Sequence, residues 1–297
     1  MRAIKGCRIE ENVIHCPRKK KRGCDPIRPD GKRVKETAIA SAIPYIMPHR
    51  YDAQNYITEY ADMEILRGFI HGKRKEGVRI SYMALILAAY HKAYLENPKI
   101  NRFIMNKKIF QRNHFCVSFV MLKSRADGTP DETTLKVFIE PEDDVLSIND
   151  KIEALVAKNS VAEHDNNTDK FANFMFSIPL LPSLVLGLAR LLDRYGLLPK
   201  FVIDLSPFHT SLFITNLASI GTDPIYHHCY EFGTTGVFLC MGKPTSNFLE
   251  GQYREKLLPL KCVLDERICS GVEYSRFWTS FQRYLKHPEL TANETTA

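Results

Sequence analysis

Strand-like and helix-like segments are mixed along residues 43–285 without a regular alternation. Short apolar runs rich in β-branched and aromatic residues stand between longer patterns of helical period. A doubly wound parallel sheet would instead repeat strand and helix in turn. The order therefore favours an α+β fold, a two-layer sandwich in which helices cover a mixed β-sheet.

Local signals give the expected elements. Ser81 is placed to cap a long apolar helix, and Ser147 with Asp150 has the S-x-x-D form of a capping box. The expected helices cover residues 64–75, 82–95, 147–156, 182–195 and 272–285. The expected strands cover residues 55–63, 107–111, 115–122, 134–140, 212–216, 236–241 and 258–264.

The stretch from Phe176 to Ile203 is the longest apolar one, but charged residues interrupt it. Its uncharged part is shorter than the roughly 20 residues of a membrane-spanning helix, so no span is expected. We expect the helix after Ile178–Pro182 to pack on the core. The alternative is a lid over a bound apolar chain.

Composition allows a full globular core, because 44% of the 297 residues are hydrophobic. The net charge of +7 comes largely from the run Arg18–Arg22, and outside that run the charges are mixed in sign, so a nucleic-acid partner is not favoured. The run resembles a nuclear localisation signal and could equally contact phosphates, but a solvated arm is favoured. Residues 1–40 are charged and proline-containing, and are expected to form an extended arm. A single compact domain over residues 41–290 and a tail over 291–297 complete the predicted organisation.

The eight cysteines include no C-x-x-C pair, so a zinc site is not expected. Cys7, Cys16 and Cys24 flank the basic run and leave a metal-binding alternative open. The N-terminus has no signal-peptide pattern, which favours the reducing cytoplasm.

Three segments, in order, resemble the catalytic domain of the dihydrolipoyl acyltransferases of 2-oxoacid dehydrogenase complexes and their relative chloramphenicol acetyltransferase. The segment 95–103 (LENPKINRF) is similar to the family's helix end with P-x-h-N. The segment 213–221 (FITNLASIG) is similar to F-T-I-S-N-L-G-x-x-G, and 258–271 (LPLKCVLDERICSG) to L-P-L-x-L-x-x-D-H-R-x-x-D-G. The chain is identified as a divergent, stand-alone member of this fold family.

The resemblance implies acyl transfer from coenzyme A or a related thioester in a homotrimer with its site between subunits. In the family, the histidine of H-x-x-x-D is the general base, and here that position is Glu266. The family aspartate that fixes the histidine loop is Ser270. The family serine whose hydroxyl stabilises the oxyanion corresponds to Thr215, which keeps a hydroxyl donor. On a trimer, Thr215 of one chain would face Glu266 of the next.

Glu266 admits three interpretations. It is a general base if an apolar channel raises its pKa, because a glutamate of ordinary pKa, roughly 4.3, is a weak base at neutral pH. It could instead hold a substrate amine or cation. It could also be a plain carboxylate in a degenerate subunit.

Three further residues are expected to line the cofactor site. Asn216 lies in the second matching segment and His228 lies shortly after it. Arg50 lies near the start of the fold, where an arginine could bind a phosphate. The alternative for Arg50 is an ion pair with Asp52. Histidines 209, 227 and 228 are possible replacement bases, although a structural role is favoured for each.

The leading function is therefore an acyltransferase that uses an acyl thioester, with Glu266, Thr215 and Ser270 at the site. The alternative is a non-catalytic homologue that serves as a binding or assembly subunit. Ser270 favours the alternative, and the hydroxyl of Thr215 favours the enzyme.

Overall fold

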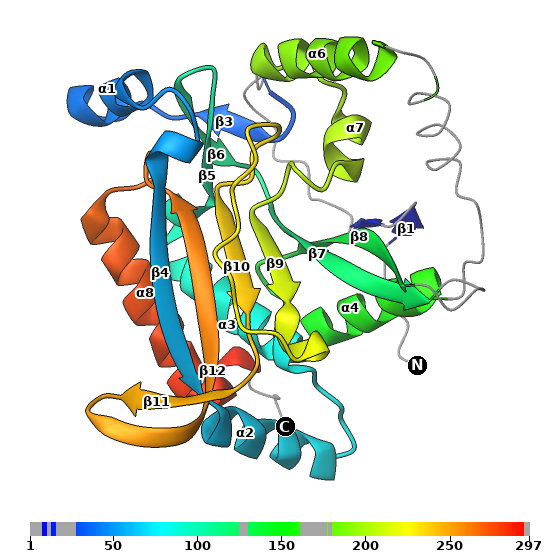
Figure 1. The fold of residues 1–297 in the computed structure, drawn as a ribbon, viewed down its shortest axis with the longest axis vertical. Coiled ribbons are helices and arrows are strands. Elements are labelled where there is room, and N and C mark those ends of the chain that lie inside the picture. Colours follow the sequence, from blue (N-terminus) through cyan, green and yellow to red (C-terminus); the bar gives the residue numbers. More distant parts are fainter. Residues whose placement is uncertain are drawn as a thin grey trace.

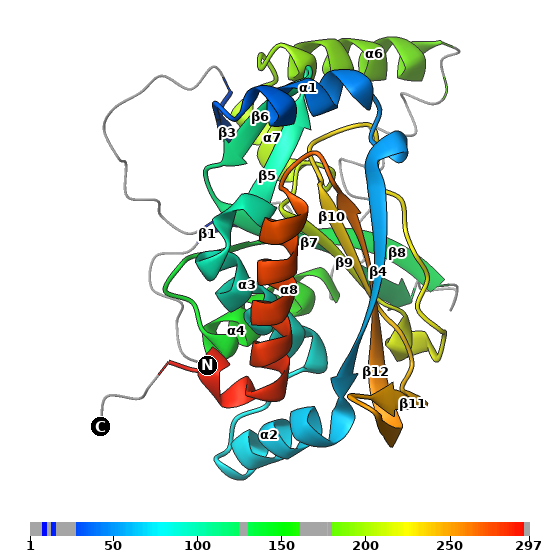
Figure 2. The same cartoon turned by 90° about the vertical axis from the view of Figure 1, so that its left-hand side faces the viewer.

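A computed structural model describes residues 8–10, 13–15, 28–124, 130–160, 177 and 180–293. One face of a mixed sheet is covered by helices, as Figure 1 and Figure 2 show from two sides. The predicted α+β sandwich is confirmed. The basic run Arg18–Arg22 and the cysteines that flank it lie outside the described residues.

The main sheet has nine strands. Eight of them follow the order β1-β2-β8-β7-β9-β10-β12-β11, and the ninth, β4, pairs with β12. The pairs β7·β9, β9·β10 and β2·β8 are parallel, and the other pairs are antiparallel. The strands are β1 (Arg8–Glu10), β2 (Val13–His15), β4 (Gln54–Asp62), β7 (Phe115–Ser124), β8 (Pro130–Ile139), β9 (Leu212–Asn216), β10 (Val237–Met241), β11 (Thr245–Leu249) and β12 (Gln252–Asp265).

A second, three-stranded sheet runs β3-β6-β5 (Gly31–Arg33, Lys108–Arg112, Arg102–Met105). The helices are α1 (Ala38–Ile46), α2 (Met63–Lys75), α3 (Tyr82–Glu96), α4 (Val145–Ser160), α6 (Leu181–Arg194), α7 (Lys200–Leu205) and α8 (Gly271–Lys286). Short 3₁₀ turns cover Tyr51–Ala53, Pro98–Asn101, Leu217–Ile220 and Pro288–Thr291. No described helix is both long and apolar enough to cross a bilayer.

The main core lies between the sheet and helices α3, α4 and α8. Alternate residues of each strand point into it, and the aromatic side of α8 meets Tyr90 of α3, whose ring lies 4.8 Å from that of Phe277 and 5.8 Å from that of Phe281. The apolar side of α8 is thus buried within its own chain. It is not available to hold a trimer together.

Most predicted elements are confirmed to within a few residues. Ser81 caps α3, since its Oγ accepts from the Ala84 N–H at 3.1 Å. The predicted capping box at Ser147 is wrong. Asp144 caps α4 instead, accepting from the backbone N–H groups of Leu146 and Ser147 at 3.1 and 2.9 Å. The sequence patterns did not predict α1, α7, β1, β2, β3 or β11.

The expected arm over residues 1–40 lies largely outside the described residues. Its described parts pair with the rest of the fold, because β2 pairs with β8, β3 pairs with β6 and Arg28 is only 1% exposed. The boundaries at 40 and 290 stay predictions.

Candidate functional site

Glu266 lies in the turn that follows β12. Its backbone N–H donates to the carbonyl of Ala53 at 2.8 Å, and its side chain is half-buried. The preceding Asp265 is buried and accepts two bonds from Arg267, to Oδ1 at 2.8 Å and to Oδ2 at 2.7 Å. Arg267 is thereby turned away from Glu266. Among the described residues, no side chain hydrogen-bonds the Glu266 carboxylate.

Arg50 holds the same turn from the other side. Its Nε lies 3.4 Å from Oδ2 of Asp265, and its guanidinium donates to the carbonyls of Tyr230 and Gly233. The alternative of an ion pair between Arg50 and Asp52 is wrong, because the Arg50 side chain turns inward to Asp265. Arg50 is 4% exposed, so a phosphate could contact only a small part of its side chain.

Ser270 serves as the N-cap of α8. Its Oγ accepts from the Glu273 N–H at 3.4 Å, and the Glu273 carboxylate accepts from the Ser270 N–H at 2.9 Å. This reciprocal pair is a complete capping box. Ser270 thus stabilises the start of the helix that follows Glu266.

Thr215 lies on β9 and pairs with a histidine. Its Oγ1 is 3.1 Å from Nε2 of His227, whose ring stacks on Phe238 at 4.2 Å. Burial, with a contribution from His228, lowers the pKa of His227, so the ring is neutral at pH 7. A neutral imidazole can either accept the Thr215 proton or donate its own.

The sequence led us to predict His228, and not His227, as a cofactor-binding residue. His228 is exposed, and His227 is the one that reaches Thr215. No local signal separates two adjacent histidines, because the contact joins residues on different segments. Burial raises the pKa of the neighbouring Cys229 to about 12, so this thiol is no nucleophile.

Two other predicted residues have clear environments. Asn216 follows Thr215 at the end of β9, and its Oδ1 is buried without a hydrogen-bond partner among the described residues. His209 is fully buried, with Nε2 3.1 Å from Asp193 and Nδ1 2.8 Å from the Ser206 hydroxyl. His209 thus has a structural role, because it connects Asp193 to Ser206 in the interior.

Thr215 and Glu266 of one chain lie far apart along the sheet. Thr215 is level with Cys240 in β10, and Cys240 is level with Lys261 in β12. Glu266 comes five residues after Lys261. At roughly 3.3 Å per residue this is about 16 Å. Within one chain the two side chains are therefore too far apart to contact each other.

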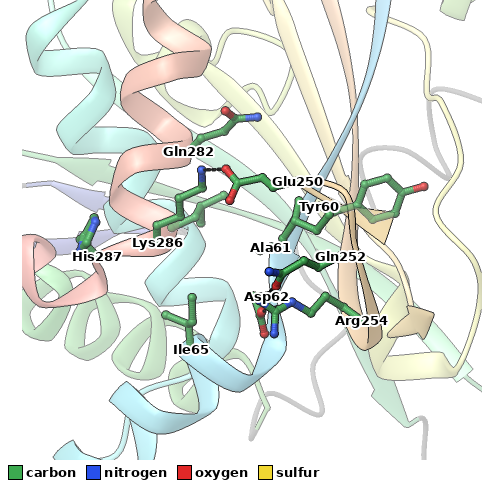
Figure 3. A pocket seen from close by; sticks show the side chains of 12 residues that line it. Tyr60, Ala61, Asp62, Ile65, Glu250, Gln252, Arg254, Gln282, Lys286 and His287 are labelled. Carbon is green, nitrogen blue, oxygen red and sulfur yellow. Dashed lines mark hydrogen bonds and ion pairs between the residues drawn. The ribbon is translucent and has the colours of Figure 1, made fainter. Parts of the chain in front are cut away.

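Two cavities lie near the ends of the sheet. The first, of about 590 Å³, is lined by Arg50 and Arg267 and by residues of α6 and the β5–β6 turn. The second, of about 420 Å³, lies among the last turn of α8, the end of β4 and the β11–β12 hairpin, where Glu250 pairs with Lys286 (Figure 3). Neither cavity is lined by Thr215 or Glu266. In the part of the chain described, no three His, Cys, Asp or Glu side chains are grouped to hold a metal ion.

Comparison with solved structures decides the fold family. The chain superposes on a probable dihydrolipoamide acetyltransferase from Listeria monocytogenes with a TM-score of 0.52 and 15% identity, covering 90% of this chain and 97% of that one. The cubic core of the pyruvate dehydrogenase multienzyme complex gives 0.52 and 14%, covering 88% and 94%. A chloramphenicol acetyltransferase gives 0.51 and 13%, covering 86% and 100%.

The fold is that of chloramphenicol acetyltransferase. At such identities the likeness establishes the architecture and no more. No protein-family model and no curated protein sequence matches the chain.

Proposed function

We propose that the protein transfers an acyl group from coenzyme A or a related thioester to an acceptor. The proposal is supported by a fold shared with acyltransferases over most of the chain. The observation that carries it is the Thr215–His227 contact, because the resemblance assigns the oxyanion donor to Thr215 and this buried hydroxyl has a neutral imidazole as its partner.

The hydroxyl of Thr215 has one proton, and its partner decides how that proton is used. If Nε2–H of His227 donates to Oγ1, the Thr215 proton is free to stabilise the oxyanion of a tetrahedral intermediate. If Nε2 accepts instead, the proton is committed to the imidazole. The proposed chemistry uses the first arrangement, in which His227 orients Thr215.

Glu266 is the proposed general base, supplied by the adjacent chain of a homotrimer. The separation of Thr215 and Glu266 within one chain supports this arrangement. Glu266 would take the proton of the acceptor hydroxyl or thiol as it attacks the thioester carbon. Coenzyme A leaves as its thiol, and the acyl group ends on the acceptor.

The experiment measures coenzyme A thiol release from acetyl-coenzyme A, with dihydrolipoamide and chloramphenicol as separate acceptors. We expect Glu266→Gln to lower the rate roughly 10²–10⁴-fold, because the amide cannot accept the proton. Glu255→Gln is the matched control, since Glu255 is an exposed carboxylate of the same strand β12. Light scattering tests the trimer, and a stable monomer at micromolar concentration would contradict the shared site.

A second function is favoured by two observations, namely that Ser270 is engaged as a helix cap and that Glu266 lacks a side-chain partner among the described residues. In this alternative the chain is a non-catalytic binding or assembly subunit. It predicts no coenzyme A binding by calorimetry and no change in Glu266→Gln. The double variant Glu266→His with Ser270→Asp separates the two, because aspartate also caps helices and restores H-x-x-x-D. A gain of transfer in that variant supports the enzyme site.

A further inference from the structure

Helix α6 buries one charged side chain and leaves a row of leucines exposed. Asp193 is the one fully buried residue of the helix. Leu184, Leu188 and Leu191 share the opposite face at helical spacing and are 69%, 54% and 53% exposed. The expectation that this helix packs its apolar side on the core is wrong.

An ionic cluster fixes that orientation. The carboxylate of Asp193 lies 2.7 Å from Arg28 and 3.1 Å from His209. Arg28 also binds Asp30 at 2.9 Å, and all four residues are at most 2% exposed. Rotation of α6 to bury the leucines would strip a buried cation of a partner, which is costly. The apolar face is therefore held toward solvent.

The exposed apolar surface continues beyond α6. Leu197 and Phe201 are each 67% exposed, and on α1 Ile39 and Ile46 are 79% and 76% exposed. Figure 1 and Figure 2 both place α1 and α6 at the same end of the molecule, above the small sheet. We call this surface, formed by α1, α6 and α7, the apolar end.

A turn between β5 and β6 joins the two helices. Asn106 accepts from Nε of Arg194 in α6 at 3.1 Å, and the Lys107 ammonium lies 5.1 Å from the ring of Tyr45 in α1. Asn106 and Lys107 both have positive φ, 50° and 59°, which makes this a tight reverse turn. The β5–β6 turn thus contacts both α1 and α6.

Basic side chains border the apolar end. Arg190, Arg194 and Lys107 are exposed and line the 590 Å³ cavity beside α6. Of the acidic residues in its lining, Asp193 is neutralised by Arg28, and Glu231 accepts from backbone N–H groups. An apolar face with a basic border complements a surface that has an anionic layer over hydrocarbon.

We propose that the apolar end docks on an anionic lipid bilayer, with the leucines of α6 among the acyl chains and the basic cavity toward lipid phosphates. A second copy of the chain fits less well, because self-association of this surface would bring Arg190, Arg194 and Lys107 against their own copies. The proposal does not depend on acyl transfer, and α6 lies on the bilayer without crossing it.

The test is co-sedimentation of the full chain with vesicles of phosphatidylcholine alone or with one quarter phosphatidylglycerol. We expect binding to the anionic vesicles that weakens as salt increases. Leu184→Ser with Leu188→Ser should weaken it about tenfold or more, and Arg190→Glu by about fivefold or more. Phe248→Ser is the control, because Phe248 is 65% exposed on the β11–β12 hairpin, away from the apolar end.

Absence of parent binding to phosphatidylglycerol vesicles would overturn the proposal. It would also fail if the double leucine variant bound vesicles like the parent but changed the oligomeric state, which would assign the surface to contacts between copies. Free inorganic phosphate that displaced the protein completely at millimolar concentration would assign the cavity to a soluble anion. If the double variant does not fold, the vesicle binding of Arg190→Glu decides the test, since Arg190 is exposed and its substitution should leave the fold intact.

Discussion

His91 of α3 makes the folded state sensitive to acid. Its ring is 0% exposed and packs beside Phe115 and Tyr94, and neither ring nitrogen has a hydrogen-bond partner among the described residues. Burial, reinforced by Lys92 and Lys151 against a weaker effect of Asp143, lowers the pKa of His91 from 6.5 to about 4. The folded protein therefore excludes a proton that the unfolded chain accepts.

The sign and size of the effect follow from this pKa. Because the folded pKa lies below the unfolded value, the contribution to stability is complete above pH 6.5 and is lost as the pH falls toward 4. At 1.36 kcal/mol per pKa unit the whole effect is about 3 kcal/mol. Between pH 7 and pH 5 the loss is about 2 kcal/mol.

Urea unfolding at pH 7 and pH 5 measures this loss. We expect His91→Phe, which keeps an aromatic ring beside Phe115, to lose about 2 kcal/mol less than the parent between the two pH values. The control is His71→Phe, because His71 is exposed on α2 and should leave the difference unchanged. Equal losses in the parent and His91→Phe would refute the reasoning.

Three further predictions concern the candidate site and its support. Ser270→Ala should lower the free energy of unfolding by about 1 kcal/mol through loss of the α8 cap, measured by urea unfolding, while Ser270→Asp should not. Asp193→Asn should cost about 3 kcal/mol, because Arg28 loses a buried carboxylate, and proteolysis should then cut near α6 faster than in the parent. Gly233→Ala should be destabilising by several kcal/mol, because φ is 86° and the new Cβ would collide with the Phe208 carbonyl; an unchanged melting temperature would contradict this.

Local patterns were enough to predict most of the architecture. Ser81 and the apolar residues after it predict α3, and the aromatic spacing after Gly271 predicts α8, because capping and periodicity are encoded over a few residues. The three motifs that resemble acyltransferases predict the fold, which comparison with solved structures confirms. The roles of Glu266 and Thr215 stay predictions.

Partners and orientation were decided by the tertiary structure. Thr215 meets His227 rather than His228, and Arg50 meets Asp265 rather than Asp52, because these contacts join segments that only the folded sheet brings together. The sequence of α6 likewise determines that the helix has an apolar side, but periodicity does not say which side is covered. The buried charge of Asp193 bears on that choice, since rotation of the helix would take this carboxylate away from Arg28 and His209.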